Sequence, residues 1–83
     1  MTKPTIHLNG TGKESLLQQT LDAAHAIQAA MDALSNAMPN ARDYYPQGPD
    51  AIKQAYAEHT ARMDMLRQIY DDLFALAEHI SDS

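Results

Sequence analysis

The side chains best suited to bind another molecule are concentrated in one short segment, residues 39–49 (PNARDYYPQGP). Arginine offers a planar fork that pairs with carboxylate or phosphate groups, and tyrosine offers a flat apolar face with a polar tip. The binding candidates of this segment are Asn40, Arg42, Asp43, Tyr44, Tyr45 and Gln47. They suit a nucleotide, a small anion or a partner protein. The structural alternative is that Arg42 and Asp43 hold the turn while the two tyrosines cover the end of a helical bundle.

A histidine later in the chain is the second candidate. His59 falls within an apolar seam, where a polar residue either hydrogen-bonds across an interface or sets specificity and contacts a ligand. Glu58 and Arg62 lie beside it, and their spacing of four residues matches an ordinary helical ion pair. We therefore add His59 and Arg62 to the residues expected to bind a ligand or partner.

Metal binding and catalysis have little support. Asp22 and His25 lie one helical turn apart, a spacing that di-iron bundles use, but such bundles repeat the motif on a second helix. Residues 50–80 contain no matching motif. No nucleophile has a base at a fixed helical spacing. We expect a protein that is not an enzyme and that uses neither a metal nor a cofactor.

The first long helix is predicted over residues 11–38. Thr11 and Glu14 match the capping box that begins many helices, and no proline follows before Pro39. One stripe at helical spacing is apolar apart from Gln28 and Ser35. Its members are Leu17, Leu21, Ala24, Gln28, Met31, Ser35 and Met38. A neighbouring stripe comprises Leu16, Ala23, Ile27, Ala30, Leu34 and Ala37.

The second long helix is predicted over residues 50–80, after Pro49, which suits a first helical turn. Its apolar residues alternate at spacings of four and three, which is typical of a heptad seam. The seam comprises Ile52, Tyr56, His59, Met63, Leu66, Tyr70, Leu73, Ala77 and Ile80. Met65, Ile69 and Leu76 widen it, and Phe74 flanks it.

Together these elements predict one all-α domain over residues 1–83. Residues 1–10 form a short extended arm, residues 39–49 a connecting loop, and the two long helices an antiparallel hairpin. Two helices alone cannot cover two wide apolar faces, so we expect the hairpins to associate into a helical bundle, most simply a dimer.

Composition limits the partners further. The 83 residues carry a net charge of −5, which disfavours non-specific binding to nucleic acid and suits a basic protein partner. The chain has no cysteine, no apolar signal segment and no stretch that could span a membrane. We expect a cytoplasmic protein that does not bind membranes.

Three short motifs resemble those of a group of small phage and prophage proteins of unassigned function. They are the start Thr5-Ile6-His7-Leu8-Asn9-Gly10-Thr11, the loop Pro39-Asn40-Ala41-Arg42-Asp43-Tyr44-Tyr45-Pro46, and the helical segment Glu58-His59-Thr60-Ala61-Arg62. The resemblance covers most of the chain. It implies a phage-type accessory protein in the cytoplasm of an infected bacterium and carries no mechanism.

The function expected from these observations is binding rather than catalysis. The first hypothesis is a phage accessory protein that counteracts a host defence function by binding a host protein. The second is an oligomeric sponge that sequesters a small nucleotide signal. The third is a purely structural helical module used in assembly.

Overall fold

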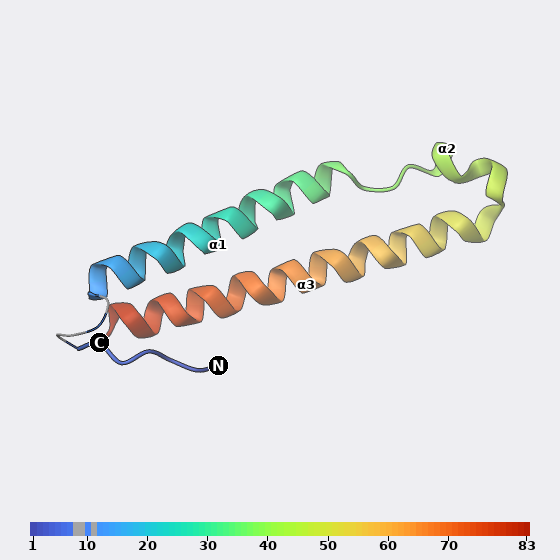
Figure 1. Ribbon diagram of the computed structural model, residues 1–83. Coiled ribbons are helices and arrows are strands. Elements are labelled where there is room, and N and C mark those ends of the chain that lie inside the picture. The colour runs from blue at the N-terminus through green and yellow to red at the C-terminus, as the bar shows by residue number, and fades with distance from the viewer. Residues whose placement is uncertain (8–9, 11) are drawn as a thin grey trace.

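The computed structural model describes residues 1–7, 10 and 12–83 of the chain (Figure 1). Two long helices, α1 (Lys13–Asn36) and α3 (Pro49–Ser81), run antiparallel and pack along their length. The short helix α2 (Ala41–Tyr44) and the 3-10 turn η1 (Tyr45–Gln47) lie between them. The expected all-helical architecture with two long packed helices is confirmed, and the described residues contain no strand.

The hairpin is markedly elongated. It measures 62 × 19 × 17 Å, and its radius of gyration is 18.4 Å. A compact domain of this length would have a radius of gyration of about 12 Å. The chain therefore has no central core, and its apolar contacts are spread along a single helix–helix line.

The long helices match the predicted ranges apart from their ends. Helix α1 begins at Lys13 after Gly12, which provides no side-chain cap. Thr11 of the expected capping box lies outside the described residues. At the other end the backbone N–H groups of Ala37 and Met38 donate to the carbonyls of Leu34 and Ser35, which ends the helix before Met38. Helix α3 begins with Pro49 at its first position and runs to Ser81.

The connection is more ordered than a simple loop. Residues 39–49 were expected to be irregular, because three prolines and a glycine interrupt helix formation. The structure instead places α2 and η1 there, each less than two turns long. Asn40 starts α2 by accepting a hydrogen bond from the backbone N–H of Arg42 (2.9 Å). Pro46 falls within the first two positions of η1, where its missing N–H costs nothing.

The buried residues lie on the faces that the two helices turn toward each other. In α1 they are Ala24 and Met31, both from the first predicted stripe. In α3 they are Ala55, His59, Ala77 and Ile80. Small alanines on both helices let the backbones approach closely, so the seam is narrow. The second stripe of α1 lies beside this seam and is only half-buried or exposed.

Tyr56 was predicted in the seam, and this prediction is wrong. Its side chain is 42% exposed, whereas its neighbour Ala55 is 6% exposed. A straight α-helix drifts by about 20° per heptad from a strict seven-residue repeat. Near the N-terminal end of α3, three heptads from Ala77, this drift has turned Tyr56 to the side of the helix and brought Ala55 inward.

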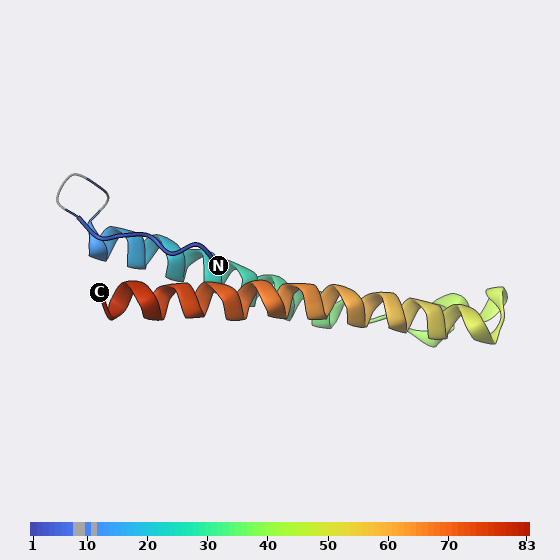
Figure 2. The same ribbon diagram turned by 90° about the horizontal axis from the view of Figure 1, so that it is seen from below.

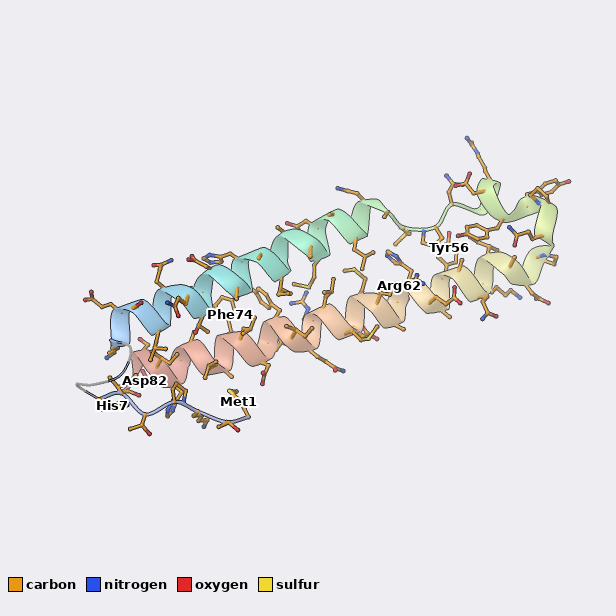
Figure 3. All side chains as sticks on the ribbon, in the orientation of Figure 1. Met1, His7, Tyr56, Arg62, Phe74 and Asp82 are labelled. Carbon is orange, nitrogen blue, oxygen red and sulfur yellow. The ribbon has the colours of Figure 1, made fainter. Side chains whose placement is uncertain are left out.

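The arm and the turn occupy opposite ends of the hairpin. Residues 1–7 form no helix or strand, and they fold back along the C-terminal end of α3 (Figures 1 and 2). Pro4 and Ile6 are half-buried there, and His7 and Asp82 lie at this same end (Figure 3). The Nζ of Lys13 donates to the backbone carbonyl of Ser83 (2.9 Å), which fixes the start of α1 beside the end of α3.

Ile80 tests the narrow seam, because it is the largest fully buried side chain and is 1% exposed. We expect Ile80→Ala to lower the free energy of unfolding by about 2–5 kcal/mol, through lost burial and the cavity left behind. Met38→Ala is the control, since Met38 is 58% exposed. Urea denaturation followed by circular dichroism, at one protein concentration, measures both. Equal losses for the two variants would contradict the assignment of the core.

Candidate binding site at the turn of the hairpin

Asn40 and the short helix α2 hold the turn from one side. The Asn40 side chain accepts from the N–H of Arg42, and the Asn40 carbonyl accepts from the N–H of Asp43 (3.0 Å). These two bonds satisfy donors that the first turn of a helix leaves free. Asn40 is therefore engaged in building the turn.

Gly48 holds the turn from the other side. Its φ of +96° lies in the region that side-chain-bearing residues rarely adopt. Its N–H donates to the carbonyl of Tyr45 (3.3 Å), and its carbonyl accepts from the N–H of Ala51 (3.3 Å). The same residue thus ends η1 and precedes the first residue of α3.

The tyrosines differ in exposure and share one hollow. Tyr44 is half-buried, whereas Tyr45 is 85% exposed. Between them lies a hollow of about 260 Å³ with mainly apolar walls. Its lining residues are Ala41, Tyr44, Tyr45, Gly48, Pro49 and Ile52. One ring therefore forms a wall of the hollow, and the other stands at its rim in solvent.

Two further hollows adjoin the first. One of about 360 Å³ is lined by Ala41, Arg42 and Tyr45, so the Arg42 side chain and the exposed ring border the same space. The other, of about 380 Å³, is more polar and lies on the other side of Tyr44. It is lined by Tyr44, Gln47, Asp50, Ala51, Gln54, Ala55 and Glu58. The turn thus offers a cation and an aromatic face on one side and two carboxylates on the other.

The structure brings together only part of the predicted set. Arg42, Tyr44 and Tyr45 line connected hollows, and Asp43 lies exposed on α2 beside them. His59 lies farther along α3, about 15 Å from Pro49 at 1.5 Å per residue, and it is only 5% exposed.

Arg62 is one helical turn beyond His59 and is exposed (Figure 3). Neither His59 nor Arg62 lines any of the three hollows at the turn, although Glu58, the residue before His59, borders one of them. His59 instead fills a buried position on the face of α3 that packs on α1.

Several residues of the site were not singled out from the sequence. Ala41, Gly48, Pro49 and Ile52 line the apolar hollow, yet none carries a reactive group. The available signal was Asn40, a preferred N-cap residue, in front of Ala41-Arg42-Asp43-Tyr44. That pattern predicts a short helix, which would have placed Ala41 and Tyr44 on the same side.

Asp22 and His25 are both exposed on α1. The Asp22 carboxylate accepts a hydrogen bond from the side-chain nitrogen of Gln18 (2.7 Å), which is a local contact within the helix surface. Within the part of the chain that the structure describes, no group of three or more histidine, aspartate or glutamate side chains is arranged to hold a metal ion.

Comparison with known proteins yields no relative: no family model, no curated protein and no solved structure matches the chain. Among the described residues, no helix combines the length and the apolar character that crossing a membrane requires. Any function must therefore be argued from the surface itself.

Replacing Gly48 tests whether the turn depends on its backbone conformation. A Cβ added there would meet no atom within 4 Å, so the cost of Gly48→Ala comes from the positive φ alone. We expect a loss of about 1–3 kcal/mol in the free energy of unfolding.

Gly12→Ala is the matched control, because a Cβ there also meets nothing within 4 Å and φ is −61°. Alanine is a poorer N-cap than glycine, but it also restricts the unfolded chain. These effects offset each other, so we expect the free energy of unfolding to change by less than about 0.5 kcal/mol. Thermal unfolding of both variants provides the comparison. Equal behaviour would show that the turn tolerates other conformations.

Proposed function

We propose that the protein is a non-enzymatic accessory protein that uses the turn of its hairpin to bind a host protein. The supporting observation is Tyr45, whose ring is 85% exposed beside an apolar hollow. An aromatic side chain loses its hydration and gains dispersion contacts when a partner covers it. The backbone around it is already fixed by the bonds of Asn40 and Gly48, so little order remains to be imposed on binding.

The residue types at the turn are those found at the centre of protein–protein interfaces. Tyrosine and arginine are the residue types most enriched among the side chains that dominate protein–protein binding energies. Tyr44, Tyr45 and Arg42 lie together here, around hollows that a partner side chain can enter. Asp43 and Asp50 border the same surface, and the whole chain carries −5. A partner with a basic patch is therefore favoured.

The resemblance to phage and prophage proteins gives this binding a setting. A small acidic protein made in an infected bacterium acts most directly by occupying a surface that a host defence protein needs. We propose that this cytoplasmic, inhibitory role is the function of the turn. Catalysis is not part of the proposal.

If the turn holds the partner, removing the exposed ring of Tyr45 should weaken binding. We expect immobilised wild-type protein to retain a stoichiometric partner from a bacterial host lysate. Tyr45→Ala should weaken that complex by about 30-fold or more, the effect of removing a residue worth at least ~2 kcal/mol. Titration of the purified partner measures the change in Kd.

Tyr56→Ala is the control for this titration, because that ring is also exposed but lies on α3 outside the three hollows. If Tyr45→Ala and Tyr56→Ala both bind the partner with wild-type affinity, the binding site does not lie at the turn. Retention of no partner at all would count against protein binding.

A second candidate function rests on the hollow that Arg42 and Tyr45 share. A guanidinium pairs with phosphate, and a tyrosine ring stacks on a planar base. The same surface therefore suits a small nucleotide signal, which an oligomer would sequester as a sponge.

A panel of mono-, di- and cyclic nucleotides in a thermal-shift assay separates this candidate from the first. A ligand at 100 times its Kd should stabilise the fold by about 2.7 kcal/mol and raise Tm. Arg42→Ala should abolish the rise. Lys53→Ala should leave it unchanged, because Lys53 is exposed on α3 and lines none of the hollows at the turn. Absence of any shift would exclude the nucleotides tested.

A further inference from the structure

The chain exposes more surface than a folded monomer of its mass. Its accessible surface is 6105 Å² for 9.2 kDa. A typical monomer of this mass exposes about 4,900 Å². The surplus of about 1,200 Å² is larger than the ~800 Å² that each partner buries in a standard interface. The hairpin thus has enough uncovered surface for a stable association.

Some of the exposed apolar side chains gather on one side of the hairpin, whereas Tyr56 and Phe74 are exposed on the other side of α3. On α3, Met65 is 57% exposed and Ile69 46% exposed, and Leu76 is half-buried beside them. On α1, the second predicted stripe has half-buried leucine and isoleucine with exposed alanines. We call this set the apolar flank. It comprises Leu16, Ala23, Ile27, Ala30, Leu34, Met65, Ile69 and Leu76.

Contacts on the other side of the hairpin show that the two halves of the apolar flank face the same way. A hollow of about 230 Å³ is lined by residues of both helices: Leu17, Leu21, Phe74, Ala77, Glu78 and Ser81. Leu21 and Phe74 therefore mark one shared side. At 100° per residue, Ile27 is about 120° from Leu21 and Ile69 about 140° from Phe74, so both isoleucines lie on the other side of the buried seam.

On the side of the hairpin that carries Leu21 and Phe74, the surface of α1 is polar. Gln18 donates to Asp22 (2.7 Å) and Gln28 donates to Asp32 (3.0 Å) there, and His25 is exposed. Such a surface remains hydrated at no cost. The apolar flank has no comparable polar cover on α1, which makes it the side that favours burial against another surface.

We propose that the apolar flank is the interface for a second copy of this chain, related by a two-fold axis perpendicular to the helices. Each helix then packs antiparallel on its own counterpart, and four helices form a bundle. This proposal does not depend on what the turn binds.

The positions of the apolar residues support this axis. The Lys13–Ser83 bond and the Leu21–Phe74 hollow fix the register, so residue 28 of α1 lies level with residue 67 of α3. The two most exposed apolar residues of α3, Met65 and Ile69, are equidistant from residue 67. An axis there places Met65 of one copy on Ile69 of the other.

The helix α1 has its own centre at the same level. Ile27 and Ala30, and likewise Ala23 and Leu34, are symmetric about a point between residues 28 and 29. In each pair a large side chain meets an alanine, which lets two antiparallel helices interdigitate. The centres of α1 and α3 coincide within the register given by the hairpin, so one axis serves both helices.

Charge is also complementary about this axis. Arg62 and Asp72 border the apolar flank, and both are five residues from residue 67. The axis therefore places Arg62 of each copy at the same level as Asp72 of the other, twice per dimer, although the two positions differ by about 80° around the helix. An opposite-charge pair at the edge of an apolar interface fixes its register.

The arrangement has a consequence for the turn. The two turns lie at opposite ends of the bundle, and position 55 of one copy lies level with His79 of the other. The hollow lined by Tyr44, Gln54 and Glu58 then faces the C-terminal end of the second copy. The dimer carries two separated binding surfaces, each bordered by both chains.

The mass of the protein in solution tests the interface. Sedimentation equilibrium at low micromolar concentration should show a dimer for the wild type and a monomer for Ile69→Glu. Tyr56→Glu, the control, changes a side chain of similar exposure (42% against 46%) on the other side of α3 and should remain dimeric.

Met65→Glu provides a second disruption should Ile69→Glu lose helicity in circular dichroism. A monomeric wild type, or dimers of wild-type affinity in both glutamate variants, would overturn the proposal.

Charge reversal tests the register. Arg62→Glu alone and Asp72→Arg alone should each weaken the dimer, because each places like charges together. The double variant restores opposite charges and should recover most of the lost affinity. If the loss of dimerisation free energy in the double variant equals the sum of the two single losses, the pairing is wrong.

A distance measurement tests the direction of the axis. The chain has no cysteine, so Gln47→Cys introduces a single site for a spin label at the turn. The proposed axis separates the two labels by about 60 Å, twice the 20 residues from position 47 to position 67 at 1.5 Å each. An axis parallel to the helices would bring both turns to one end. A separation below about 30 Å would overturn the antiparallel dimer.

Discussion

Two helices have only one line of contact, and this constraint governs the whole molecule. Each helix can turn one stripe toward the other, so the buried residues are few, and two of the most buried positions, Ala24 and Ala77, are alanines. The hydrophobic effect scales with the area removed from water. A narrow seam therefore leaves a thin margin, and the surface beside it stays exposed unless another chain covers it.

The sequence predicted the helices well because their signal is local. Apolar residues repeat every three to four positions over both long segments, and prolines mark where each segment stops. The ends were less accurate: α1 begins after Gly12 and stops at Asn36, since backbone bonds near Leu34 end it early. Tyr56 was misplaced because a heptad template assumes a repeat of 3.5, whereas a straight helix turns every 3.6 residues.

The site illustrates a different limit. Residue types indicated that Arg42, Tyr44 and Tyr45 could recognise a ligand, and the structure places them around connected hollows. The sequence did not show the geometry that unites them, which depends on a short helix and on the positive φ of Gly48. His59 was added to this set because it falls within the apolar seam, and Arg62 because it lies beside His59. The structure buries His59 against α1, and neither residue lines the hollows at the turn.

The turn has hydrogen bonds of its own in addition to its contacts with α3, and this suits a binding protein. The turn is held by its own hydrogen bonds, from Asn40 and Gly48, rather than by the packing of α1 on α3. Its exposed side chains can therefore change with little effect on the helices. The residues of the seam and the apolar flank are placed by the repeat of the two long helices, so a substitution there alters helix packing. A small chain organised in this way can keep one scaffold while its turn adapts to a new partner.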